Sequence, residues 1–228
     1  MSILPVFGYK QITAENFSLG SDLVRNVAER TGHNLMHMKL SDMAQGQWLN
    51  QPAAIEVSES GFFVTANENS DFWRTTSYGF IHETGHALLN DFPQNSSLEV
   101  SWLLSYDQQF DQAGLMVWSD EENWIKAGVE YADGVPQLGA VVTAGLSDWS
   151  VAPVPEWRNK EVHLRISRSG DALTIRSRCD GEWQLVRLVP LDPNKFWRAG
   201  IHLASPTRAG LTIHFTSLSR GEPDSTLH

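Results

Sequence analysis

The chain has 228 residues, of which 41% are hydrophobic, so it is long enough for one large domain with a sizeable core. Its formal net charge of -10 argues against general nucleic-acid binding, which needs clustered lysine and arginine to replace counterions on phosphates. Cys179 is the only cysteine, and the N-terminus lacks the apolar core of a secretion signal or membrane span. We therefore expect a cytoplasmic protein without an internal disulfide and with neither nucleic acid nor membrane as a partner.

The first part of the chain, residues 1–47, differs from the rest. Its strongest secondary-structure pattern predicts a short helix over residues 22–30, with Ser21 as a candidate N-cap. We predict a partly helical or irregular N-terminal appendage over 1–47, one β domain over 48–218 and a C-terminal tail over 219–228.

From Trp48 onward, short segments of alternating hydrophobicity are separated by turn residues, which is typical of β-strands. The predicted strands are 54–57, 61–66, 98–106, 113–118, 124–131, 137–143, 161–167, 172–178, 183–188, 198–203 and 211–215. Gly170 and Gly181 mark two hairpin turns between neighbouring strands. Ten or more strands spaced in this way predict an all-β fold, a two-sheet sandwich or jelly roll.

Three arginines, Arg165, Arg176 and Arg178, fall at alternating positions of one predicted hairpin and would share its outer face. A basic patch on such a face could contact an anionic partner. We favour the alternative of a solvated convex face.

The segment 78–89, YGFIHETGHALL, contains the HExxH pattern of zinc peptidases at His82, Glu83 and His86. In that interpretation the segment is a helix whose two histidines bind zinc while the glutamate activates a metal-bound water. The extended pattern fails, however, because Leu89 and Phe92 replace the later glycine and third histidine of a metzincin.

The competing interpretation of the same segment is a β-hairpin with Thr84 and Gly85 at its tip. A hairpin would place His82 and His86 across a turn, where they could bind a metal adventitiously without forming a catalyst. We favour the hairpin and predict no metal centre and no cofactor.

Three blocks together resemble a known family: DFWRTTSYGFIHETGHAL from Asp71, DQAGLMVWSDEENWIKAGVEYADG from Asp111 and VVTAGLSDWSV from Val141. They are similar to the DUF1349, or regulator-of-enolase-like, family, and the likeness covers about residues 48–215. The resemblance implies a concanavalin A-like lectin and glucanase fold, in which two large antiparallel sheets form a jelly roll with a concave binding face. It also implies the hairpin interpretation of residues 82–86. The activity of the family is largely uncharacterised, so the resemblance implies more about fold than about function.

Strict alternation in the central block puts polar and aromatic side chains on one face of two strands. Gln112, Lys126 and Glu130 fall on this face and could converge on the concave sheet. Trp73, Arg74 and Trp149 lie in polar segments of the family blocks and could edge the same groove. An aromatic platform combined with hydrogen-bonding side chains is typical of a sugar site. In the alternative interpretation, Lys126 and Glu130 only pair with charges on neighbouring strands.

The sequence therefore predicts a carbohydrate-binding protein without demonstrated catalysis, and it leaves the question of an enzyme open. The competing hypothesis is a protein-interaction module that regulates a metabolic enzyme, as the resemblance suggests. A glycoside hydrolase has weaker support, because Glu130 is the only acid on its strand face and would need a partner such as Asp111 or Asp148. A zinc peptidase is the fourth candidate.

Overall fold

The computed structural model describes residues 35–37 and 45–227. The helix predicted over residues 22–30 lies outside this part of the chain. Within the described residues the regular structure is almost entirely β, apart from the one-turn 3-10 helix η2 (Pro155–Trp157). No helix among them is long and apolar enough to cross a membrane.

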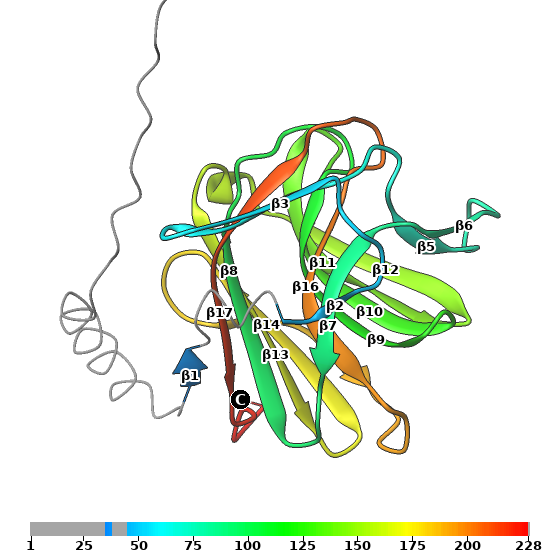
Figure 1. Cartoon of the computed structure of the whole chain (residues 1–228). Helices are drawn as coiled ribbons and strands as arrows, with labels where there is room; N and C mark the ends of the chain where they lie inside the picture. Colours follow the sequence, from blue (N-terminus) through cyan, green and yellow to red (C-terminus); the bar gives the residue numbers. More distant parts are fainter. Residues whose placement is uncertain (1–34, 38–44, 228) are drawn as a thin grey trace, which may run out of the picture. The chain divides into compact units, whose positions relative to one another are not determined.

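Two antiparallel sheets form a sandwich (Figure 1). The eight-stranded sheet has the order β15 (Gln184–Pro190), β14 (Ala172–Arg178), β13 (Glu161–Ser169), β8 (Ser96–Leu103), β17 (Thr212–Gly221), β4 (Gly61–Thr65) and β3 (Ala54–Ser58), with β1 (Leu35–His37) also paired to β17. The seven-stranded sheet has the order β12 (Leu146–Pro153), β11 (Val135–Ala144), β10 (Asn123–Ala132), β9 (Gln112–Asp120), β16 (Arg198–Ala204), β7 (His86–Asp91) and β2 (Gln47–Trp48). A separate ribbon pairs β5 (Phe72–Arg74) with β6 (Ile81–Glu83). The predicted all-β jelly-roll sandwich is confirmed.

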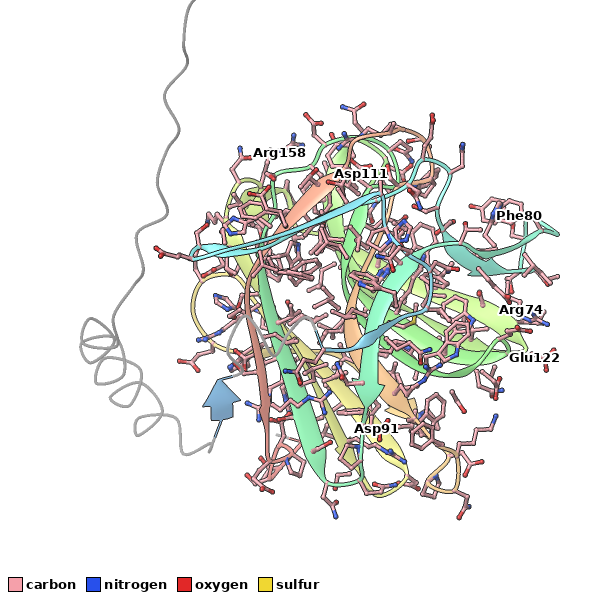
Figure 2. All side chains as sticks on the ribbon, viewed as in Figure 1. Arg74, Phe80, Asp91, Asp111, Glu122 and Arg158 are labelled. Atoms are coloured by element: carbon pink, nitrogen blue, oxygen red, sulfur yellow. The ribbon has the colours of Figure 1, made fainter. Side chains whose placement is uncertain are left out.

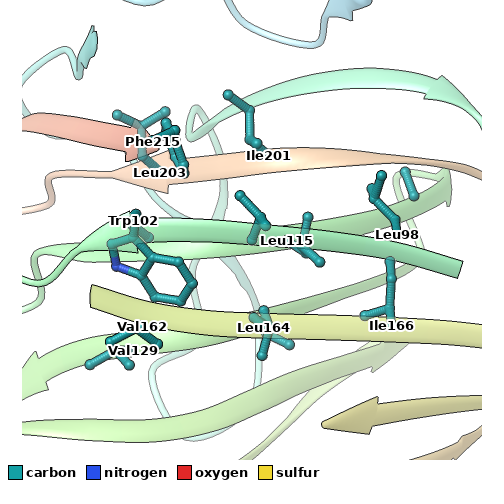
Figure 3. Close-up of a cluster of buried hydrophobic side chains, with 14 of the residues drawn as sticks. Leu98, Trp102, Leu115, Val129, Val162, Leu164, Ile166, Ile201, Leu203 and Phe215 are labelled. Atoms are coloured by element: carbon teal, nitrogen blue, oxygen red, sulfur yellow. The ribbon is translucent and has the colours of Figure 1, made fainter. Parts of the chain in front are cut away.

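The main core lies between the two sheets and follows the alternation of the strands. One face of most strands of the two sheets supplies apolar side chains to this core, including Trp102, Leu115, Val129, Leu164 and Phe215 (Figure 3). Complete burial of such a side chain stabilises the fold by about 1.5–3 kcal/mol relative to exposure. The opposite faces of β9 and β10 are therefore free to serve another purpose.

One long strand, β12, was not among the predicted strands. It is the edge strand of its sheet, and all of its residues except Ser147 are exposed. Because β12 has no buried face, its apolar and polar residues need not alternate, and the alternation that predicts a strand is missing.

The hairpin predicted around Thr84 and Gly85 is wrong, although both flanking segments are strands. β6 pairs with β5, whereas β7 pairs with β16 and β2. The backbone N–H groups of Thr84 and Gly85 both donate to the carbonyl of Asp71, at 2.9 and 2.8 Å. These bonds direct the chain from the ribbon into the seven-stranded sheet instead of folding it back on itself.

The predicted solvated face of arginines is also wrong for Arg165, which is only 4% exposed. Its Nε lies 3.2 Å from Oδ1 of Asp224, and the Nε of Arg176 lies 3.0 Å from the other oxygen of the same carboxylate. Arg165 also donates to the carbonyl of Glu222. The chain beyond β17 thus covers this face, which local alternation could not reveal because the cover comes from distant residues.

This arrangement predicts that Asp224→Ala will lower the free energy of unfolding by about 1–3 kcal/mol, because the mostly buried Arg165 guanidinium loses the nearer of its two carboxylate partners. The matched control is Asp180→Ala, which removes an exposed ion pair with Lys160 and should cost less than about 1 kcal/mol. Urea unfolding of both variants measures the difference. Equal costs would contradict the structural role of the Asp224 carboxylate.

Candidate ligand-binding groove

A second apolar cluster lies on the outer face of the seven-stranded sheet, beneath the β5–β6 ribbon. It contains Phe72, Trp73, Ala87, Leu89, Met116, Trp118, Trp124 and Val141. The strand faces opposite the main core supply Met116, Trp118 and Trp124 to this cluster. These side chains are buried because the ribbon covers them. The ribbon is therefore bound to the sheet by hydrophobic packing.

Phe72 is the centre of this packing and is completely buried. Its ring centroid lies 6.1 Å from that of Trp118, 5.9 Å from that of Trp124 and 6.0 Å from that of His202. A Cβ atom on Gly85 would lie only 2.4 Å from the Phe72 ring. Gly85 is not among the residues with positive φ, so the absence of a side chain here provides space and not backbone freedom.

The ribbon and the sheet together enclose a groove of about 450 Å³. Its aromatic wall consists of Trp73, Tyr78, Phe80, Phe110 and Trp149. Its polar lining comprises Asn69, Asp71, His82, Gln112, Lys126, Glu130 and Thr207. Figure 2 shows Phe80 on the protruding ribbon. The volume lies within the range of small-molecule sites, about 300–1,000 Å³.

The rings of the wall contact one another. Trp73 packs edge-on against both Tyr78 and Trp149, with centroid distances of 5.5 and 6.4 Å, and Tyr78 stacks on Phe80 at 5.3 Å. Tyr78 is 58% exposed and Trp149 is 36% exposed. A continuous aromatic surface is therefore accessible from solvent on one side of the groove.

Lys126 occupies the floor and is only 5% exposed. Its Nζ donates to Oε1 of Gln112 at 2.7 Å and lies 3.2 Å from Oδ1 of Asp71. The same Asp71 oxygen accepts the backbone N–H of Phe72. The positive charge of Lys126 is thus compensated within the groove.

Glu130 lies beside Gln112 on the neighbouring strand and has no hydrogen bond or ion pair within the described part of the chain. Burial raises the pKa of its carboxyl group to about 7, and the nearby negative charges of Asp71 and Asp133 act in the same direction. Lys126 opposes this shift without cancelling it. The Glu130 carboxyl group therefore keeps its proton to a higher pH than an exposed glutamate does.

Five of the six predicted site residues line the groove: Trp73, Gln112, Lys126, Glu130 and Trp149. Arg74 does not. Its guanidinium pairs with Glu83 at 3.2 Å and Glu122 at 2.7 Å (Figure 2). It thereby ties the ribbon to the turn between β9 and β10.

Sequence reasoning missed Asp71, Tyr78, Phe80, His82 and Phe110 as groove residues. The dense aromatic pattern around Tyr78 was a usable signal. The partnership of Asp71 with Lys126 spans 55 positions and left no local signal.

The two acids considered as partners for Glu130 lie elsewhere. Asp111 is fully buried and pairs with Arg208, and Asp148 pairs with Arg187 at 2.9 Å. Neither lines the groove.

The residues of the HExxH match have other contacts. Both ring nitrogens of His86 are engaged, because Nε2 accepts the backbone N–H of Asn67 at 2.9 Å and Nδ1 donates to the carbonyl of Asn50 at 3.1 Å. Burial lowers the pKa of His86 and favours this neutral ring. His82 lies on a strand, against Phe80. The segment is not the helix that a peptidase requires, and the absence of a catalytic zinc centre stays a prediction.

The structure is the two-sheet antiparallel sandwich that the family resemblance implied. More specifically, residues 48–223 match the family model described as "Protein of unknown function (DUF1349)", and the chain belongs to this family. It is 34% identical over 190 residues to "Regulation of enolase protein 1" of Saccharomyces cerevisiae, covering 83% of this chain and 96% of the yeast protein.

Solved structures agree with the fold. A crystal structure of a functionally unknown Saccharomyces cerevisiae protein matches with a TM-score of 0.75 and 34% identity, over 82% of this chain and 100% of that chain. A xylan β-1,4-xylosidase from Bacillus halodurans C-125 matches with a TM-score of 0.59 and 14% identity, over 96% of this chain and 41% of the enzyme. The second likeness concerns the fold alone.

The raised pKa of Glu130 predicts a pH-dependent effect of Glu130→Gln on stability. A carboxyl group that binds its proton more tightly in the folded state stabilises the fold fully below its ordinary pKa of 4.5, and this contribution is lost as the pH rises to about 7. Glutamine cannot ionise, so the variant should be more stable than the wild type by about 1–3 kcal/mol at pH 8 and nearly unchanged at pH 4.5. Thermal unfolding at both pH values measures this.

The exposed Glu121, replaced by glutamine, is the matched control and should show no such pH dependence. Identical pH profiles for the two variants would contradict the buried state of the Glu130 carboxyl group.

Proposed function

We propose that this protein binds carbohydrate in the groove between the β5–β6 ribbon and the seven-stranded sheet. The observation that carries the proposal is the division of the groove into an aromatic wall and a polar floor. A sugar ring has apolar faces that pack against aromatic side chains and hydroxyl groups that need hydrogen-bond partners. Trp149 and Tyr78 suit the first role, and Glu130 suits the second.

Binding without catalysis is the simpler form of this proposal. Asp71 and Glu130 line one groove, but Asp71 already accepts bonds from Lys126 and the backbone of Phe72. The proposal needs no metal or cofactor, and it retains the cytoplasmic location expected from the sequence.

The test is a broad glycan array probed with the wild type and with Trp149→Ala. Loss of a stacking platform should weaken binding by about tenfold, since an aromatic contact contributes about 0.5–1.5 kcal/mol beyond its buried area. Phe196→Ala is the control, because Phe196 is 65% exposed and does not line the groove. Binding that survives the double replacement of Lys126 and Glu130 by alanine would reject the placement, and no glycan binding at all would reject the function.

A second candidate is regulation of a metabolic enzyme through direct contact. The name of the yeast relative, "Regulation of enolase protein 1", supports it, because the two chains are 34% identical over almost the whole of that protein. The exposed side chains of Tyr78, Ile81 and Leu146 around the ribbon offer apolar contact area for a protein. Binding to purified enolase, unaffected by added sugar and weakened by Ile81→Ser, would favour this candidate over the first.

A further inference from the structure

A small recess of about 20 Å³ adjoins the groove. It shares Gln112, Lys126, Glu130, Val141 and Trp149 with the groove. The recess and the groove are therefore parts of one site.

The floor of the recess is bare backbone. Gly128 lies opposite Gly139 on β11 and opposite Gly114 on β9, so three glycines form a row across adjacent strands. A Cβ atom on any of them would lie 2.0 Å from a carbonyl oxygen of the next strand. No side chain can fill this strip without moving the backbone, which keeps the recess open.

Two residues that line this recess have polar groups without a hydrogen-bond partner within the described part of the chain. Glu130 is half-buried, and its carboxyl group makes no hydrogen bond. His202 is only 2% exposed, and its Nδ1 is unpaired. Burial holds the pKa of His202 well below its ordinary value, so the ring is neutral and has one N–H group and one acceptor nitrogen. A buried polar group without a partner, such as Nδ1 of His202, destabilises the protein, and a ligand group that bonds it can recover this loss.

Charge restricts what can enter. The recess has room for at least one water-sized group, because about 10–15 Å³ of space for the centre of a water molecule is enough to hold one. The ammonium group of Lys126 is already engaged by Asp71 and Gln112, so it offers little to a ligand anion. A carboxylate, sulfate or phosphate would meet the Glu130 carboxyl group, and Lys126 beside it is already engaged.

We propose that the glycine-floored recess is a hydroxyl-binding subsite, in which one hydroxyl group of an uncharged sugar hydrogen-bonds to Glu130 and His202. This inference rests on the proposed carbohydrate binding and names the ligand class of that site. The hydroxyl group donates to one of the two partners and accepts from the other, because each can take either role. The aromatic wall then packs against the face of the ring.

The first experiment is an array that contains neutral, uronate, sulfated and phosphorylated glycans. The protein should select neutral glycans. The strongest neutral ligand is then compared, by calorimetry, with analogues that each lack one hydroxyl group, using the wild type, Glu130→Leu and Glu130→Gln. One deletion should weaken binding to the wild type by about tenfold or more, as expected for a buried polar group left unpaired.

Removal of the same hydroxyl group from the ligand should change the affinity of Glu130→Leu little, because this variant lacks the carboxyl group that bonds the hydroxyl. In Glu130→Gln the removal should again weaken binding, because the glutamine amide can still form hydrogen bonds. Asp148→Asn, at an exposed carboxylate outside the groove, should behave as the wild type. Thermal unfolding checks that every variant is folded.

A preference for acidic glycans, or equal effects of every hydroxyl deletion in wild type and Glu130→Leu, would overturn the subsite while leaving carbohydrate binding in place. Failure to bind any glycan would remove the proposed function, and the subsite with it.

Discussion

The packing of the Phe72 ring into the space above Gly85 is the contact on which the groove depends. The ring covers Trp118 and Trp124, which would otherwise expose large apolar surfaces on the outside of the sheet. It also fixes the position of its chain neighbours. Asp71 is held beside Lys126, and Trp73 is held against Trp149, so the polar floor and the aromatic wall are both set by one buried side chain.

The same contact explains why a peptidase-like motif occurs in this chain. Gly85 provides space for Phe72, Glu83 pairs with Arg74, and His86 joins the backbones of Asn50 and Asn67. The hydroxyl group of Thr84 accepts the backbone N–H of Asp71. Every residue of the HETGH segment except His82 thus has a structural role at the junction between ribbon and sheet. The motif match requires no metal to account for it.

Much of the fold could be predicted from the sequence, because alternation is a local property of strands that have one buried face. Residues 172–178 were predicted with the bounds of β14, and the inward face of β10 was identified from Ile125, Ala127 and Val129. Gln112, Lys126 and Glu130 were found in the same way, since they alternate with core positions of their strands. Trp73 and Trp149 were found instead from the polar segments of the family blocks.

The remaining features depend on contacts between distant parts of the chain. Arg165 is covered by residues about 57 positions away, and Asp71 meets Lys126 across 55 positions. The raised pKa of the Glu130 carboxyl group results from burial in the folded chain. The pairing of β6 with β5 instead of β7 had no local sequence signal either. The alternation of residues along a strand predicts which side chains share a face, but it does not predict which distant segment of the chain covers that face.

A double-mutant cycle between Phe72→Ala and Gly85→Ala tests the central contact most directly. Gly85→Ala alone should destabilise the fold by about 1–3 kcal/mol, because its methyl group meets the Phe72 ring. In the Phe72→Ala background the same change should cost almost nothing, which gives a coupling energy of about 1–3 kcal/mol. Additive effects of the two substitutions would contradict the account, since the ribbon would then be held by something other than this contact.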